Sequence, residues 1–253
     1  MRDPHVERLY FRISAEEGTA YRNPPTLSFT NALGKFETQA ATLVIEPAAH
    51  FASEDEARAV IEAYLRAWEI EADLAHNLGT IRFTFDRADL VDRDPPPPGH
   101  HSLMAGTARL VITMHPATLT VTRNEYPAPP KVLRTSPEVQ IAYQRWREVR
   151  LNREPLLGMA YWLLTLVEFM AGNRKRAATT FNIEFAVLDT LGRLSSTRGD
   201  LASGRKVKPR QSGLSPAEQS WLEVAVKRLI LQVGQHGSGS PVPKFSMSDL
   251  PPL

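Results

Sequence analysis

The chain of 253 residues contains no cysteine, and this absence removes several kinds of chemistry at once. Without thiols there is no disulfide, no thiolate ligand for a metal and no cysteine nucleophile. The lack of cysteine also favours a cytoplasmic protein over a secreted one, and residues 1–5 lack the apolar run of a signal peptide. We therefore expect a cytoplasmic protein.

The sequence also lacks the motifs that identify common enzyme classes. It has no phosphate-binding loop of the Walker type, no G-x-S-x-G and no H-E-x-x-H. Glu168 is the carboxylate that we most expect to be buried, but such a group more often pairs with an arginine than acts as acid or base. His100 and His101 follow four prolines, and a metal shared by these neighbours needs a third ligand from elsewhere. We expect no catalytic residue, no metal and no cofactor.

No apolar run exceeds the minimum length needed to cross a membrane. The strongest one, residues 155–171, has 17 residues with Glu168 near its end, at the lower limit for a hydrocarbon core of roughly 30 Å. We expect this run to be a buried helix and expect no membrane partner.

The residues that are present have the composition of an ordinary globular chain, with 42% hydrophobic and 23% charged residues. The charge is divided unevenly along the sequence. Residues 1–100 hold 10 Lys and Arg against 17 Asp and Glu, whereas residues 101–253 hold 20 against 11. Two explanations stay open: the two halves attract each other, or the basic half binds an anionic partner.

The first half has short segments typical of β-strands around one strong helix. We expect strands at residues 6–13, 27–29, 38–46 and 81–85, and a hairpin formed by residues 106–114 and 118–123. Ser53 and Glu56 have the spacing of a capping box and predict a helix that ends at Gly79. Residues 1–124 are thus expected to form a small mixed or antiparallel sheet with one helix.

The second half is predicted to be helical after a proline-rich linker at residues 125–135. Helices are expected at residues 136–152, 155–171, 177–194 and 215–234. Ser136 and Ser215 are the predicted N-caps of the first and last of these, each followed by proline. Their short connections favour an antiparallel four-helix bundle over residues 136–236, which makes the fold class α+β. Residues 237–253 include 10 Gly, Ser or Pro, so we expect a disordered tail.

A basic loop between the last two predicted helices is the candidate binding site. Its members are Arg198, Arg205, Lys206, Lys208 and Arg210. Loops rich in Arg and Lys can bind the phosphates of nucleic acid or of another polyanion. The alternative is that this loop docks on the acidic first half of the chain. Few aromatic residues lie among the basic residues at 174–210, so a platform for stacking single-stranded bases is not indicated.

A mixed N-terminal domain, a compact helical domain and a basic segment before the last helix together resemble the HEPN-type proteins of bacterial defence and toxin systems. The resemblance covers residues 136–236 and implies RNA cleavage by an Arg and a His that lie four to six residues apart on one helix. This chain departs from that pattern, because Arg228 and His236 are separated by seven residues and Gly234 is expected to end the helix. The pairs with matching spacing lie outside predicted helices, and they are Arg93 with His100 and Arg109 with His115.

The leading hypothesis is a non-enzymatic binding protein whose basic loop contacts nucleic acid or an acidic protein surface. The tail around Phe245 and Leu250 is expected to dock in the groove of a partner protein. Two alternatives stay open: a HEPN-type ribonuclease, and a homo-oligomeric structural subunit such as a homodimer, with an apolar helix face as its interface.

Overall fold

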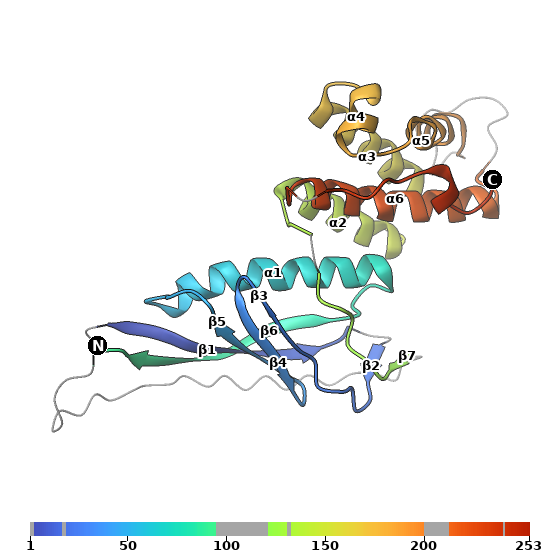
Figure 1. Ribbon diagram of the computed structural model, residues 1–253. Helices are drawn as coiled ribbons and strands as arrows, with labels where there is room; N and C mark the ends of the chain where they lie inside the picture. The colour runs from blue at the N-terminus through green and yellow to red at the C-terminus, as the bar shows by residue number, and fades with distance from the viewer. Residues whose placement is uncertain (1–2, 17–18, 95–120, 131–132, 200–212, 240) are drawn as a thin grey trace. The chain divides into compact units, whose positions relative to one another are not determined.

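A computed structural model describes residues 3–16, 19–94, 121–130, 133–199, 213–239 and 241–253. The chain divides into two compact units, Met1–Pro129 and Pro130–Leu253, which we call the sheet unit and the helical unit. The sheet unit combines strands with one helix, and the helical unit contains helices, so the predicted α+β class is confirmed (Figure 1).

The sheet unit is built on a five-stranded antiparallel sheet. Its strands follow the order β3-β4-β5-β1-β6, and a separate parallel pair joins β2 to β7. The elements in chain order are β1 (Pro4–Ser14), β2 (Thr19–Tyr21), β3 (Ser28–Asn31), β4 (Gly34–Gln39), β5 (Thr42–Pro47), α1 (Glu54–Ala75), β6 (Arg82–Asp92) and β7 (Val121–Arg123). In β1, Leu9 lies opposite Ile45 of β5 and Ala88 of β6, so β1 joins the two sides of the sheet. Most of the predicted hairpin at residues 106–123 lies outside the described residues.

One predicted strand is in fact a hairpin. The interval 38–46 contains the end of β4 and most of β5, which are joined by a two-residue turn at Ala40 and Ala41. Ala40 has a φ of 55°, in the left-handed region that such turns require and that glycine or asparagine normally supplies. The turn was missed because its sequence does not contain those residues.

The core of the sheet unit lies between α1 and one face of the sheet. Ser53 accepts a hydrogen bond from the backbone N–H of Glu56, which confirms the predicted start of α1. Alternate residues of the strands meet the apolar side of α1 around Trp68, which is 1% exposed. The buried cluster comprises Val6, Leu9, Phe11, Ile13, Phe36, Leu43, Ile45, Ala57, Ile61, Leu65, Trp68, Ala72 and Ile81.

Two histidines face each other where β1 begins. The Nδ1 atoms of His5 and His50 lie 3.1 Å apart, and the two rings are inclined by 13°. At this distance one Nδ1 donates a hydrogen bond to the other, so the pair holds one proton between these two atoms. Burial of His5 lowers its pKa, and the nearby charges of Arg93 and His50 lower it further. The carboxylates of Asp3 and Glu7 act in the opposite direction.

We expect the sheet unit to lose stability in mild acid. Because the folded pKa of His5 lies below its ordinary value of 6.5, the unfolded chain takes up more protons as the pH falls through and below that value. The free energy of unfolding should therefore decrease between about pH 7 and 5, by less than the limit of about 1.4 kcal/mol per pH unit set by one proton. Urea unfolding at several pH values measures this slope.

His5→Gln should flatten the slope, and His236→Gln, which changes an exposed histidine of the helical unit, should not. If the His5→Gln protein had the same slope as the wild type, the loss of stability in acid could not be attributed to His5.

The helical unit contains five described helices rather than the four that were expected. They are α2 (Pro137–Arg150), α3 (Leu156–Ala171), α4 (Arg174–Thr180), α5 (Phe185–Thr197) and α6 (Pro216–His236), followed by a 3₁₀ turn at Met247–Asp249. The predicted caps are confirmed: Ser136 accepts from the N–H of Val139, and Ser215 forms a complete capping box with Glu218.

The predicted helix at residues 177–194 is interrupted. Phe181 and Ile183 are both buried, and between them Asn182 has a φ of 50°. A continuous helix would turn these two residues by about 200°, onto opposite sides, so the break lets both side chains enter the core.

Gly234 does not end the last helix, as was expected, but lies inside α6. A Cβ on Gly234 would lie 2.3 Å from Cδ1 of Leu133, and the carbonyl of Gly234 accepts a hydrogen bond from the N–H of Arg134. The glycine is therefore needed for the close approach of the chain that precedes α2.

The expectation of a disordered tail is wrong for residues 241–253. Phe245 is 2% exposed, and its backbone exchanges hydrogen bonds with Asn182 and Glu184. Gln232 of α6 donates to the carbonyl of Pro243. The composition of the segment predicted disorder. The buried side chain of Phe245 and its hydrogen bonds to the backbone at the helix break hold the segment in place.

Phe245→Ala should lower the free energy of unfolding of the helical unit by about 3 kcal/mol, at the lower end for a buried phenylalanine, because the segment can detach. Leu253→Ala, at a side chain that is 52% exposed, should change it little. Thermal and urea unfolding compare the two. A loss at Phe245 below about 1 kcal/mol would mean that the tail is not docked in solution.

Candidate functional site

Of the five predicted basic residues, the structure describes Arg198. It follows the last turn of α5, and its Nε donates to Glu218 of α6 at 2.8 Å. The pKa of Glu218 is lowered, first by the N–H of Ser215 and also by Arg198. Arg198 therefore serves to join two helices. Arg205, Lys206, Lys208 and Arg210 lie outside the described residues.

A second basic group surrounds α4 and was not singled out as a site. Arg174 is its centre: Nε donates to Glu168 of α3 at 2.7 Å, and Nη1 donates to Asp189 of α5 at 3.3 Å. The guanidinium lies against Gly192 of α5, where an added Cβ would be 2.9 Å from both Nη atoms. Arg174 thus joins three helices, and Glu168 serves as its ion-pair partner.

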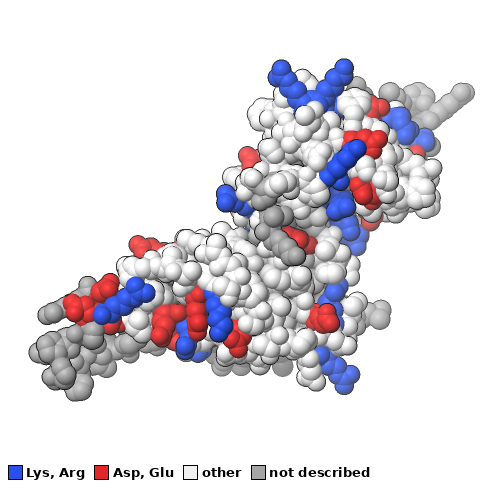
Figure 2. Space-filling model, in the orientation of Figure 1, with Lys and Arg blue, Asp and Glu red and all other residues white. Residues whose placement is uncertain are grey.

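Three exposed cations adjoin this junction, and with Arg174 they form what we call the α4 surface. They are Lys175, Arg176 and Arg193. The guanidinium of Arg176 lies over Gly172, and Arg193 follows Gly192 on α5. Figure 2 shows basic side chains projecting from the helical unit over α4. Among the described residues none of the three forms an ion pair with a carboxylate.

The described carboxylates of the helical unit are already bound within that unit. Their partners are an arginine, a serine or a backbone N–H, for Glu138, Glu148, Glu154, Glu168, Glu184, Asp189, Glu218, Glu223 and Asp249. The whole unit holds 18 Lys and Arg against 10 Asp and Glu. The excess positive charge is thus left at the surface, and part of it gathers around α4.

The fold does not explain the cations of α4. Its first turn contains Arg174, Lys175 and Arg176 and no acidic residue. The N-terminal end of a helix carries partial positive charge, so an exposed cation there costs about 0.3–1 kcal/mol. Arg174 is compensated by two carboxylates, but the described part of the chain offers none to Lys175 or Arg176.

One end of the apolar helix α3 is exposed, although its sequence predicted burial on all sides. Phe169 is 84% exposed and Met170 41%, and Phe185 at the start of α5 is 44% exposed. Trp162 is half-buried, with Arg145 over its ring. Sequence analysis missed Phe169 because it precedes the basic stretch that was searched for aromatic residues.

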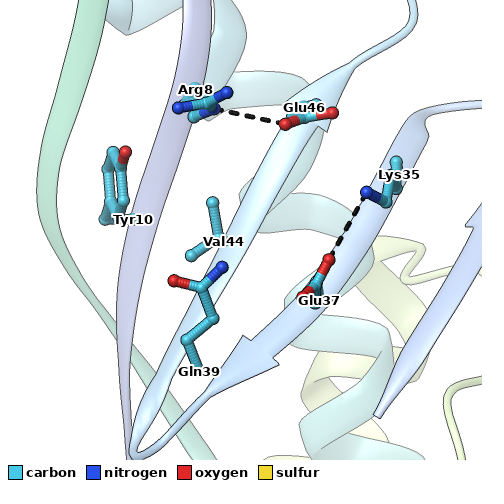
Figure 3. A pocket seen from close by; sticks show the side chains of 7 residues that line it. All are labelled: Arg8, Tyr10, Lys35, Glu37, Gln39, Val44 and Glu46. Carbon is cyan, nitrogen blue, oxygen red and sulfur yellow. Dashed lines mark hydrogen bonds and ion pairs between the residues drawn. The ribbon is translucent and has the colours of Figure 1, made fainter. Parts of the chain in front are cut away.

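The sheet unit has a hollow of about 280 Å³ on the face away from α1 (Figure 3). Its two cations are each paired: Arg8 with Glu46 at 3.2 Å, and Lys35 with Glu37 at 3.4 Å. The remaining lining residues are Tyr10, Gln39 and Val44. Contact with Tyr10 and Glu46 raises the pKa of Arg8, so this cation stays charged. Because its charges are balanced, the hollow has little net attraction for an ion.

The buried carboxylates of α1 are also engaged. Asp73 is 2% exposed and accepts from Arg82 at 2.7 Å and from the N–H of Thr80. Glu69 accepts from Arg66 and from the N–H of Phe83. The bonds from Arg82 and from the N–H of Phe83 fasten the C-terminal end of α1 to β6.

The arginine and histidine considered for RNA cleavage do not converge. Arg228 and His236 both lie on α6, eight positions apart, so their backbones are separated by about 12 Å along the helix. Arg228 faces the ring of Phe245, and His236 packs on Phe181. His100, His101, Arg109 and His115 lie outside the described residues. Within the described ranges, no group of three or more His, Asp or Glu is placed to hold a metal.

No single described helix is both long and apolar enough to span a membrane. The bent pair of α3 and α4, with an angle of 80° between its helices, meets the length and composition criteria only when the two are taken together. Six side chains of α3 are buried in the helical unit, from Leu157 to Val167.

Searches against protein-family models, curated proteins and solved structures find no match to this chain.

The contact between Arg174 and Gly192 can be tested by a double-mutant cycle. Replacing glycine by alanine inside a helix normally stabilises it by about 1 kcal/mol. In this protein the added methyl group would displace the guanidinium, so Gly192→Ala should gain clearly less in the wild type than in an Arg174→Ala background. Urea unfolding of the four proteins measures the coupling, and equal gains in both backgrounds would show that the contact is absent.

Proposed function

We propose that this protein is a non-enzymatic binding module whose α4 surface contacts an anionic polymer, with nucleic acid as the leading candidate. The observation that supports the proposal is the exposure of Lys175, Arg176 and Arg193 without a described carboxylate partner. The described carboxylates of the unit already have partners, so an external polyanion would supply the opposite charge.

The arrangement suits a phosphate backbone. Three of the four cations are arginines, whose planar guanidinium groups form paired hydrogen bonds with phosphate oxygens. The two cations in the first turn of α4 cost helix stability when nothing is bound, and a bound anion would remove that cost. In sequence, the basic loop at residues 198–210 follows α5 directly.

Charge reversal at α4 should separate binding from folding. Lys175→Glu/Arg176→Glu places acidic residues in the first turn of a helix, which favours the fold, so unfolding should be unchanged or slightly harder. Binding to a labelled oligonucleotide of about 20 nucleotides should weaken about 10-fold or more, and the slope of log affinity against log salt should fall by about 2. Fluorescence anisotropy at about 50–200 mM salt measures both quantities.

The matched control is Arg150→Glu/Arg153→Glu, which reverses two exposed cations between α2 and α3, at the end of α3 remote from α4. Equal loss in the control would indicate a general charge effect, and no binding by the wild type at low salt would refute the proposal. Poly-glutamate is tested in parallel, and preference for it would identify an acidic protein as the partner. Intact RNA after incubation would exclude cleavage, whereas cleavage lost in Arg228→Ala or His236→Ala would support the ribonuclease alternative.

A further inference from the structure

We infer that the α4 surface is built for single-stranded nucleic acid, with Phe169 as a stacking platform for a base. This inference rests on the proposed function and goes beyond it by naming the form of the polymer. Phe169 is 84% exposed, the highest value among the large hydrophobic residues that the structure describes. Exposure of a whole phenyl ring to water is unfavourable unless something covers it.

Phe169 and the cations of α4 lie at the same bend between α3 and α4. Phe169 follows Glu168, which binds Arg174, and it precedes Gly172 by three positions. Residues three apart at the end of a helix are neighbours, with Cβ atoms about 5–6 Å apart. Because the guanidinium of Arg176 lies over Gly172, Phe169 and Arg176 lie within about one helical turn of each other.

An exposed aromatic ring beside basic groups is the combination that single-stranded nucleic acids require. The cations contact the phosphates along the strand, and a base stacks on the ring. In a duplex the faces of the bases are covered by their neighbours, so the ring adds nothing. The surface should therefore prefer single strands to duplexes, without a strong preference for sequence.

The same residues fit a membrane surface less well. Peripheral binding needs a broad apolar face, but beside Phe169 the side chain of Met170 is only 41% exposed, and Leu163, Leu164 and Val167 are buried in the unit. Arginine rather than lysine predominates among the four cations, which suits planar recognition of phosphate and stacking with bases.

Substitutions at Phe169 test the inference. Phe169→Ala should weaken binding of a labelled single-stranded DNA or RNA of about 20 nucleotides by about 10-fold and leave binding of a duplex of the same length unchanged. Phe169→Leu keeps an apolar side chain but removes the ring, so it should behave like alanine, whereas Phe169→Trp should keep the affinity. Ile141→Ala, at another exposed apolar residue of the helical unit, is the control and should change nothing.

The possible failures are distinguishable. If Lys175→Glu/Arg176→Glu abolishes binding but single strands bind no tighter than duplexes, or Phe169→Leu equals the wild type, the stacking inference is refuted and the proposed function stands. If no oligonucleotide binds, both are refuted. Vesicles of phosphatidylserine and phosphatidylcholine form a further arm, and binding to them that requires Phe169, with no binding to oligonucleotides, would assign the surface to a membrane.

Discussion

Arg174 donates hydrogen bonds to carboxylates on two other helices, and through these bonds α4 is fixed against α3 and α5. The contact needs Gly192, because any side chain at that position would occupy the space of the guanidinium. Once Arg174 is held in this way, the next two residues of the helix, Lys175 and Arg176, are exposed. The position of the exposed charge is therefore a consequence of one structural ion-pair cluster, which joins the fold of the helical unit to its proposed function.

The two units use their charges differently. On the sheet, Arg8, Arg12 and Lys35 each meet a carboxylate on a neighbouring strand or on their own strand, so the charges are neutralised where they lie. Exposed pairs of this kind contribute little stability, at most about 1 kcal/mol each, but they remove net charge from the surface. In the helical unit the carboxylates are fewer, and four of the described ones, Glu168, Asp189, Glu218 and Glu223, pair with arginines of other helices or of a helix end. Part of the excess of Lys and Arg in the second half of the sequence is thus found at exposed side chains, including Lys175, Arg176 and Arg193.

Sequence patterns correctly predicted the helices and strands that depend on residues close together in the sequence. Ser53, Ser136 and Ser215 were identified as caps because a side-chain hydrogen bond starts each helix, and a composition typical of strands identified β1. The errors have tertiary causes. Ala40 and Asn182 take left-handed backbone conformations that their surroundings impose, and Phe245 is ordered by a distant helix break. For the site, sequence found basic residues near α5, but it gave no means of telling Arg198, which is paired, from Arg193, which is exposed.

The exposure of Phe169 has the same kind of cause. Along α3 the apolar residues up to Val167 are buried, so the sequence predicted burial to the end of the helix. The chain then bends by 80° into α4, whose short length covers little of the last turn of α3. An apolar ring and a run of cations are therefore left at the same bend. A polymer that offers both flat apolar faces and regularly spaced negative charge matches this pairing better than a simple anion or an apolar partner alone.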